Sequence, residues 1–134
     1  MSSFYLQIVT PDGLLFDGQA ETLTVRTIDG DVTVLAGHTD YVTALGMGRA
    51  KVTVDDTPRY AACIGGMLLV NDGKVKLVAT TFEWTDEIDV ARAEASAERA
   101  RAILNEREKH TEDEIALAEA RLKRALVRTG AAEM

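Results

Sequence analysis

The sequence is poor in the residues that support covalent and redox chemistry. Its 134 residues include one cysteine, two prolines and one tryptophan, and aromatic residues make up 5% of the chain. A single cysteine excludes an intramolecular disulfide, which fits a reducing compartment. Cys63 lies in an apolar run with no neighbouring base, so we predict a buried small hydrophobe rather than a nucleophile. With so few aromatics, the core must consist mostly of Val, Leu, Ile and Ala.

Basic charge and long apolar runs are also missing. The net charge of −7 argues against nucleic acid as a partner, because phosphates favour a basic face. No basic stretch followed by an apolar run opens the chain, so we expect no signal peptide. No apolar stretch approaches the roughly 20 residues that cross a bilayer, so we expect no direct membrane insertion. A Gly-x-x-x-x-Gly-Lys phosphate loop and a Cys/His metal spacing are absent as well, and we therefore expect no metal, no required cofactor and no intrinsic catalysis.

Glycine and proline are absent between Ile88 and Arg128, which divides the chain into two parts. Residues 1–87 have a net charge of −6 and alternate like a small β-domain, whereas residues 88–134 have a net charge of −1 and are rich in Ala, Glu and Arg. A dense but balanced charge is typical of a solvated helical surface with a narrow apolar stripe. We predict two domains, residues 1–87 and residues 88–134.

Short strands are predicted throughout the first part, separated by Asp-Gly turn signals. The predicted strands are Tyr5–Thr10, Glu21–Ile28, Asp31–Leu35, Tyr41–Leu45, Arg49–Val54, Arg59–Ile64, Met67–Val70 and Lys74–Ala79. Many short strands at this spacing favour a β-sandwich or flattened barrel over βαβ units.

The second part predicts an antiparallel hairpin of two helices. The first helix covers Val90–Glu106 behind an N-cap at Asp89, and the second begins at Thr111 with a capping box. The predicted apolar rows are Ala93, Ala97, Ala100 and Leu104, facing Ile115, Ala118, Leu122 and Ala125. An alanine seam buries little area, so we expect a weakly held hairpin that can move.

Four motifs in this order resemble the ε subunit of bacterial F-type ATP synthases. They are LQIVTPDG at residues 6–13, GDVTVLAGH at residues 30–38, IGGMLLV at residues 64–70 and IDVARA at residues 88–93. The likeness covers nearly the whole chain. The sequence departs from the family pattern at Ala36, where proline is usual, and at Asp31, where glutamate is more common.

The resemblance implies a non-catalytic subunit of the central stalk, on the cytoplasmic face of the bacterial plasma membrane. The sandwich would join the shaft subunit γ to the ring of c subunits, and so couple proton or sodium flow to ATP synthesis. The hairpin would fold against the sandwich or extend along the shaft into the α/β catalytic head, where it would obstruct hydrolysis.

Two groups of site residues follow from the resemblance. Asp31 and His38 would contact the c-ring, although turn chemistry with a solvated charge explains them equally well. ATP, as a regulatory ligand, would contact Glu83, Ile88, Asp89, Arg92, Ala93, Arg99, Arg124 and Arg128. Guanidinium groups suit phosphate oxygens, but the same residues could be only a cap, a hydrophobic staple and a solvated face.

The sequence is also compatible with a second class of protein. A free-standing β-sandwich adaptor with a helical dimerisation tail would share the two-part organisation. Such a coil would carry sustained leucine or isoleucine heptads, whereas the seam here is alanine-rich and is broken near His110.

Overall fold

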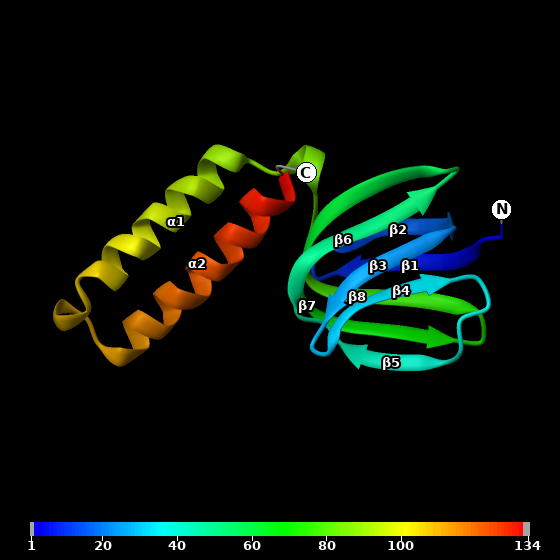
Figure 1. The fold of residues 1–134 in the computed structure, drawn as a ribbon, viewed down its shortest axis with the longest axis horizontal. Coiled ribbons are helices and arrows are strands. Elements are labelled where there is room, and N and C mark those ends of the chain that lie inside the picture. Colours follow the sequence, from blue (N-terminus) through cyan, green and yellow to red (C-terminus); the bar gives the residue numbers. More distant parts are fainter. Residues whose placement is uncertain (1, 133–134) are drawn as a thin grey trace. The chain divides into compact units, whose positions relative to one another are not determined.

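The computed structural model describes residues 2–132, in which an eight-stranded sheet precedes two helices. The strands are β1 (Phe4–Thr10), β2 (Gly13–Ala20), β3 (Thr22–Thr27), β4 (Gly30–Leu35), β5 (Tyr41–Ala44), β6 (Met47–Val54), β7 (Thr57–Asn71) and β8 (Lys74–Trp84). The helices are α1 (Val90–Asn105) and α2 (Glu112–Ala132), with 3-10 turns η1 (Thr85–Glu87) and η2 (Arg107–Lys109) before each (Figure 1). The predicted fold class, a β-sandwich followed by a helical hairpin, is confirmed.

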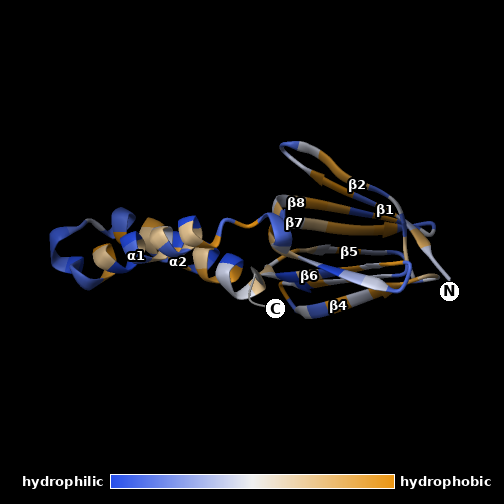
Figure 2. Cartoon of the chain, turned by 90° about the horizontal axis from the view of Figure 1, so that it is seen from above, coloured by the Kyte–Doolittle hydropathy of each residue, from blue (hydrophilic) through white to orange (hydrophobic). Residues whose placement is uncertain are grey.

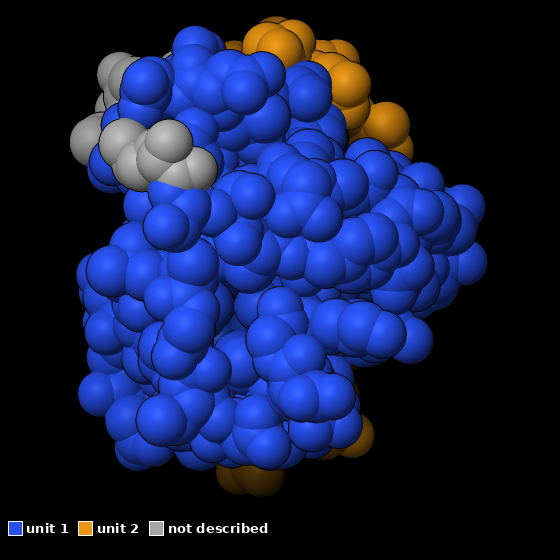
Figure 3. All heavy atoms as spheres, turned by 90° about the vertical axis from the view of Figure 1, so that its right-hand side faces the viewer, with its two compact units in different colours: residues 1–85 blue, residues 86–134 orange. Residues whose placement is uncertain are grey.

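The chain forms two compact units, residues 1–85 and residues 86–134, which are coloured separately in Figure 3. The group of buried side chains that makes up the main core lies entirely between Phe4 and Trp84. Orange hydrophobic stretches are prominent in β7 and β8, whereas the helices alternate blue polar stretches with tan turns (Figure 2).

One long strand, β7, belongs to both layers of the sandwich. The strand order is β2-β1-β8-β7-β6-β3-β4, and β5 also pairs with β7. The first half of β7 pairs with β6 and the second half with β5, and the strand bends between them at Gly65 and Gly66. A Cβ on Gly66 would lie 1.9 Å from the Val78 carbonyl oxygen, so only glycine fits this bend.

The predicted strands differ from the structure in two places. Arg59–Ile64 and Met67–Val70 are one strand, because the Gly-Gly bend does not interrupt the pairing of β7 with β8. The prediction also missed β2, an edge strand on which Leu14 and Leu15 are both exposed. The inward positions of β2 are Phe16, Gly18 and Ala20, and two of these three side chains are too small to give a clear hydrophobic alternation in the sequence.

Local turn and cap chemistry follows the sequence closely. Asp72 and Gly73 both have positive φ, 53° and 76°, as a tight hairpin turn between β7 and β8 requires.

Cys63 is buried, as predicted, and burial raises the pKa of its thiol to about 12. The thiolate is therefore scarce at neutral pH, and the thiol is inert.

Candidate functional site

Asp31 and His38 lie at the two ends of β4 rather than in one loop. The Asp31 carboxylate pairs across the strands with Arg26 on β3, at 3.0 Å between Nε and Oδ1, and both side chains are exposed. The His38 ring lies beyond the other end of β4, with Nδ1 2.7 Å from the Thr39 carbonyl oxygen. The strand predicted at Asp31–Leu35 is present as β4 and separates the two side chains.

The outer face of the sheet around β8 carries an apolar row that the sequence analysis did not identify. The register places Met67 beside Val78, Val78 beside Val9, and Val9 beside Leu14. On the far side of Met67 stands Ala44 of β5. Met67, Val78 and Leu14 are 45%, 38% and 54% exposed, so five neighbouring strands present a continuous apolar row to solvent. Exposed rows of this kind mark interaction surfaces.

Residues at the start of α1 form a helix cap. The Arg92 amide donates to Asp89 Oδ1 at 3.0 Å, and the Ala93 amide donates to the Asp89 carbonyl oxygen at 3.0 Å. Ala93 is completely buried in the seam and Ile88 is half-buried. Asp89 therefore caps the helix with one carboxylate oxygen. Glu83 lies on β8, opposite Ala62, in the other compact unit.

The predicted seam is the packed face of the hairpin. Ala93, Ala97 and Ala100 of α1 and Ala118 and Ala125 of α2 are all buried. Leucine side chains of the rows, Leu104 and Leu122, are partly buried. Thr129, four residues after Ala125, is also partly buried and continues the row of α2. The two helices run antiparallel (Figure 1).

Five arginines lie on one side of this seam, and we call them the arginine side. Each of them directly precedes a seam residue in the sequence, so each is rotated from the seam by about −100°. In an antiparallel pair of right-handed helices, residues that are rotated from the seam by the same angle about their own helix axes lie on the same side of the pair. The arginines of α1 and those of α2 therefore share one side. The arginine side consists of Arg92, Arg99, Arg121, Arg124 and Arg128. The structure thus brings together the four predicted arginines and adds Arg121, which could have been found because Leu122 was already assigned to the seam.

The opposite side of the hairpin carries the acidic residues. Glu94, Glu98 and Glu119 each directly follow a seam residue, so their rotation has the opposite sign. Arg101 bonds Glu98 at 2.7 Å, and Arg107 bonds Glu119 at 3.3 Å. Within residues 2–132, by contrast, Arg92, Arg99, Arg121 and Arg124 form no ion pair.

Like charges gathered without counter-charges are unfavourable for folding. Glu114 is a carboxylate on the arginine side, because it directly precedes the seam residue Ile115. Glu114 lies near the start of α2 and is bonded to His110, at 2.6 Å between Oε2 and Nδ1. The arginine side is therefore suited to an anion.

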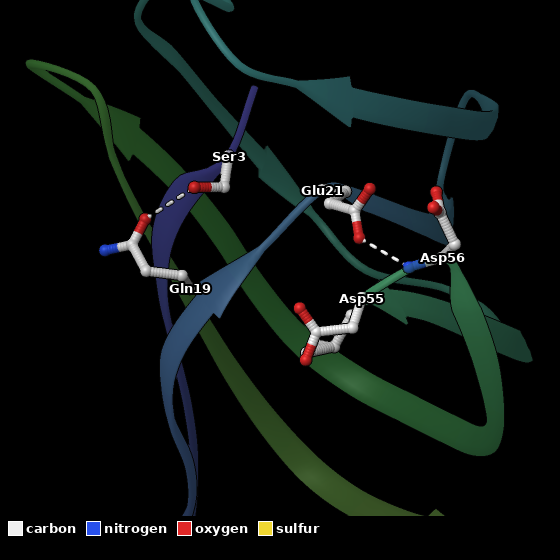
Figure 4. A pocket seen from close by; sticks show the side chains of 6 residues that line it. Ser3, Gln19, Glu21, Asp55 and Asp56 are labelled. Carbon is white, nitrogen blue, oxygen red and sulfur yellow. Dashed lines mark hydrogen bonds between the residues drawn. The ribbon is translucent and has the colours of Figure 1, made fainter. Parts of the chain in front are cut away.

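A separate acidic hollow of about 220 Å³ lies in the sandwich (Figure 4). Its lining residues are Ser3, Gln19, Glu21, Val54, Asp55 and Asp56. The Asp56 amide donates to Glu21 Oε1 at 2.7 Å. Three carboxylates make this hollow unsuited to a nucleotide phosphate. In the part of the chain that the structure describes, no three His, Cys, Asp or Glu side chains are arranged to hold a metal ion.

Family models match both compact units. Residues 3–85 match the β-sandwich domain of the ATP synthase delta/epsilon chain, and residues 86–133 match its long α-helix domain. No helix among residues 2–132 has the length and apolar character needed to cross a bilayer.

Relatives and solved structures agree with these matches. The ATP synthase epsilon chain of Ruminococcus albus is 40% identical over 133 residues, covering 98% of both chains. That of Caldicellulosiruptor saccharolyticus is 38% identical, covering 96% of this chain and 92% of the relative. A chain in the Euglena gracilis mitochondrial ATP synthase is 26% identical, with a TM-score of 0.80, over 99% of this chain and 81% of that one. A chain of the Tetrahymena thermophila enzyme shares the fold, with a TM-score of 0.61 at 17% identity, over 96% of this chain and 95% of that one. The chain belongs to the ATP synthase epsilon-chain family.

Proposed function

We propose that the chain is a non-catalytic rotor subunit of the ATP synthase central stalk, with two roles divided between its two units. The sandwich couples ion flow through the c-ring to synthesis by joining the ring to the shaft subunit γ. The hairpin restrains ATP hydrolysis when it extends along the shaft into the α/β head. Full-length identity of 40% to a bacterial epsilon chain supports the assignment.

The apolar row on the outer face of the sheet supports the shaft contact. It crosses five strands and exposes Met67, Val78 and Leu14. Burying such a row against a partner is favourable by about 25 cal/mol per Å² of apolar surface. A rigid sheet keeps the row in fixed geometry, which suits a subunit that must turn with its shaft.

The two ends of β4 are the proposed contacts with the c-ring. Asp31 is exposed and pairs with the exposed Arg26, and a surface pair of this kind contributes little to folding. Its carboxylate can exchange Arg26 for a polar group of the ring at small cost. His38 offers a second, partly exposed polar group beyond the other end of the strand.

The arginine side carries the regulatory part of the proposal. ATP has several negative charges, and four arginines of the hairpin without ion pairs among the described residues present guanidinium donors from both helices. A ligand that contacts both helices stabilises the folded hairpin over the extended one. At a hundred times its dissociation constant, ATP would add about 2.7 kcal/mol to the folded state. Abundant ATP would then favour the non-inhibitory state.

Calorimetric titration of the chain with ATP tests the regulatory role. We expect saturable binding by the wild type, and loss of binding in both Arg92→Ala and Arg124→Ala, because the two residues contribute from different helices. Arg101→Ala, on the acidic side, removes the same charge and should bind normally. Absence of binding by the wild type at millimolar ATP would refute ATP regulation and leave the stalk role to be tested by assembly with γ.

A further inference from the structure

One end of the sandwich gathers turns that are rich in carboxylates. The register places Thr22 beside Leu35 and beside Thr53, so β3 begins where β4 and β6 end. The Asp72 amide donates to Asp40 Oδ1 at 3.0 Å, which brings the turn between β7 and β8 to the same end. The acidic residues of this end are Glu21, Asp40, Asp55, Asp56 and Asp72. Within residues 2–132, none of them forms an ion pair with a Lys or Arg side chain.

Glu21 is buried, whereas the other four acidic residues of this end are exposed. The residue is 9% exposed and lines the hollow of about 220 Å³ (Figure 4). The Asp56 amide donates to Glu21 Oε1 at 2.7 Å, but Oε2 is buried and accepts no hydrogen bond from any described residue. A buried carboxylate oxygen without a donor is unfavourable. The hollow therefore lacks a donor for this oxygen.

The hollow suits a cation that donates hydrogen bonds. Asp55 and Asp56 line it together with Glu21, so three carboxylate residues border one small space. Among the described residues, no three His, Cys, Asp or Glu side chains are arranged to hold a metal ion, which argues against direct metal coordination. A charge-assisted hydrogen bond needs only a nitrogen to oxygen distance of about 2.7–2.9 Å. The missing donor is therefore a nitrogen cation.

The geometry at Glu21 favours an ammonium group over a guanidinium group. A guanidinium binds a carboxylate most strongly through both oxygens at once. At Glu21 this contact is blocked, because the Asp56 amide already occupies Oε1. An ammonium has three donors that point in different directions, so it can bond Oε2 with one of them and the Asp55 and Asp56 carboxylates with the others. Val54 also lines the hollow and offers an apolar surface to a methylene stem.

We propose that the hollow binds the primary ammonium group of a lysine side chain from a partner polypeptide. Asp40 and Asp72 extend the negative charge of this end beyond the hollow, which attracts a basic segment rather than an isolated amine. All residues of the site lie in the unit of residues 1–85, so the inference is independent of the proposed nucleotide role of the hairpin.

Nuclear magnetic resonance of the full chain tests the site. The Asp56 amide is the reporter, because it bonds Glu21 directly. The probe is the peptide Gly-Lys-Gly with both ends blocked, titrated at fixed ionic strength. We expect a saturable shift of the Asp56 amide signal. The same peptide with trimethyl-lysine keeps the charge but has no N–H donor, and we expect it to bind about tenfold more weakly.

Three variants locate the contact. Glu21→Gln removes the buried charge and keeps an oxygen for the Asp56 amide, whereas Asp55→Asn removes a charge at the rim, where asparagine tolerates the positive φ of 51°. Asp29→Asn is the matched control, since Asp29 is exposed in the turn between β3 and β4, at the opposite end. We expect the lysine peptide to bind about tenfold more weakly to Glu21→Gln, more weakly to Asp55→Asn, and normally to Asp29→Asn.

Several outcomes would overturn this inference. Absence of a saturable shift with the lysine peptide refutes the site. Equal binding of the trimethyl-lysine peptide, or equal weakening in Glu21→Gln and Asp29→Asn, would show that net charge alone accounts for the binding. If an arginine peptide binds as tightly as the lysine peptide, the assignment to an ammonium group is wrong. If free 1,4-diaminobutane binds more tightly than the lysine peptide, the hollow serves a small amine and the polypeptide partner is wrong.

Discussion

At the residue scale, Gly66 allows a single strand to serve both layers of the sandwich. Its φ is 113°, and the space where a Cβ would stand is filled by the backbone of Val78. We expect Gly66→Ala to lower the free energy of unfolding of the sandwich by about 2–4 kcal/mol, because both the dihedral and the contact are unfavourable. Urea unfolding followed by Trp84 fluorescence measures the change.

Gly73→Ala is the matched control for this prediction. Gly73 also has a positive φ, of 76°, but nothing lies within 4 Å of the position that a Cβ would take there. Only the dihedral penalty applies, and we expect a loss of about 1 kcal/mol. Equal losses in the two variants would mean that the close approach of β7 and β8 at Gly66 does not constrain the bend.

At the element scale, the junction between the helices contains a contact that depends on pH. The hydrogen bond from His110, with a smaller contribution from Thr111, lowers the pKa of the Glu114 carboxyl. A carboxyl whose folded pKa lies below its unfolded value of about 4.3 stabilises the fold above that value. This stabilisation disappears as the pH falls through the lowered pKa.

We therefore expect wild-type α2 to be more stable than Glu114→Gln at pH 6, with the difference shrinking as the pH falls below about 4.3. Thermal unfolding followed at the helical circular dichroism band measures this difference. Glu112→Gln is the control, since it removes a first-turn acid without touching the His110 contact. A difference that persists at acidic pH would show that the charged form of Glu114 is not what stabilises the junction.

The hairpin was more predictable from sequence than the edges of the sandwich. Alanine spacing identified the seam, and Thr111 identified the start of α2, where the Glu114 amide donates to its hydroxyl at 3.2 Å. The edge strand β2 left a weaker pattern, because its inward positions include Gly18 and Ala20. The pairing of Asp31 with Arg26 depends on the cross-strand register of β3 and β4, and a single sequence does not determine register.

At the scale of the whole molecule, the sandwich core contains no residue of the hairpin among residues 2–132. We expect a fragment of residues 1–85 to fold by itself and to unfold cooperatively. In the assembled ATP synthase, deletion of residues 86–134 should preserve ATP synthesis and raise ATP hydrolysis, because the proposed inhibitory segment is gone. Measurement of both activities in membranes tests this expectation. Unchanged hydrolysis would contradict the proposed inhibition by the hairpin.

The parallel pairing of β1 with β8 has a mechanical consequence. Tyr5 is level with Lys74 and Val9 with Val78, so the start of β1 lies beside the start of β8, while the chain leaves the sandwich at the far end of β8. A force that pulls the first strand backwards and the last strand forwards loads their shared hydrogen bonds in shear, all at once rather than one after another. The sandwich should thus resist stretching between its two chain ends far better than the alanine seam does. In a rotating shaft, strain would then be taken up by opening of the hairpin while the sandwich stays intact.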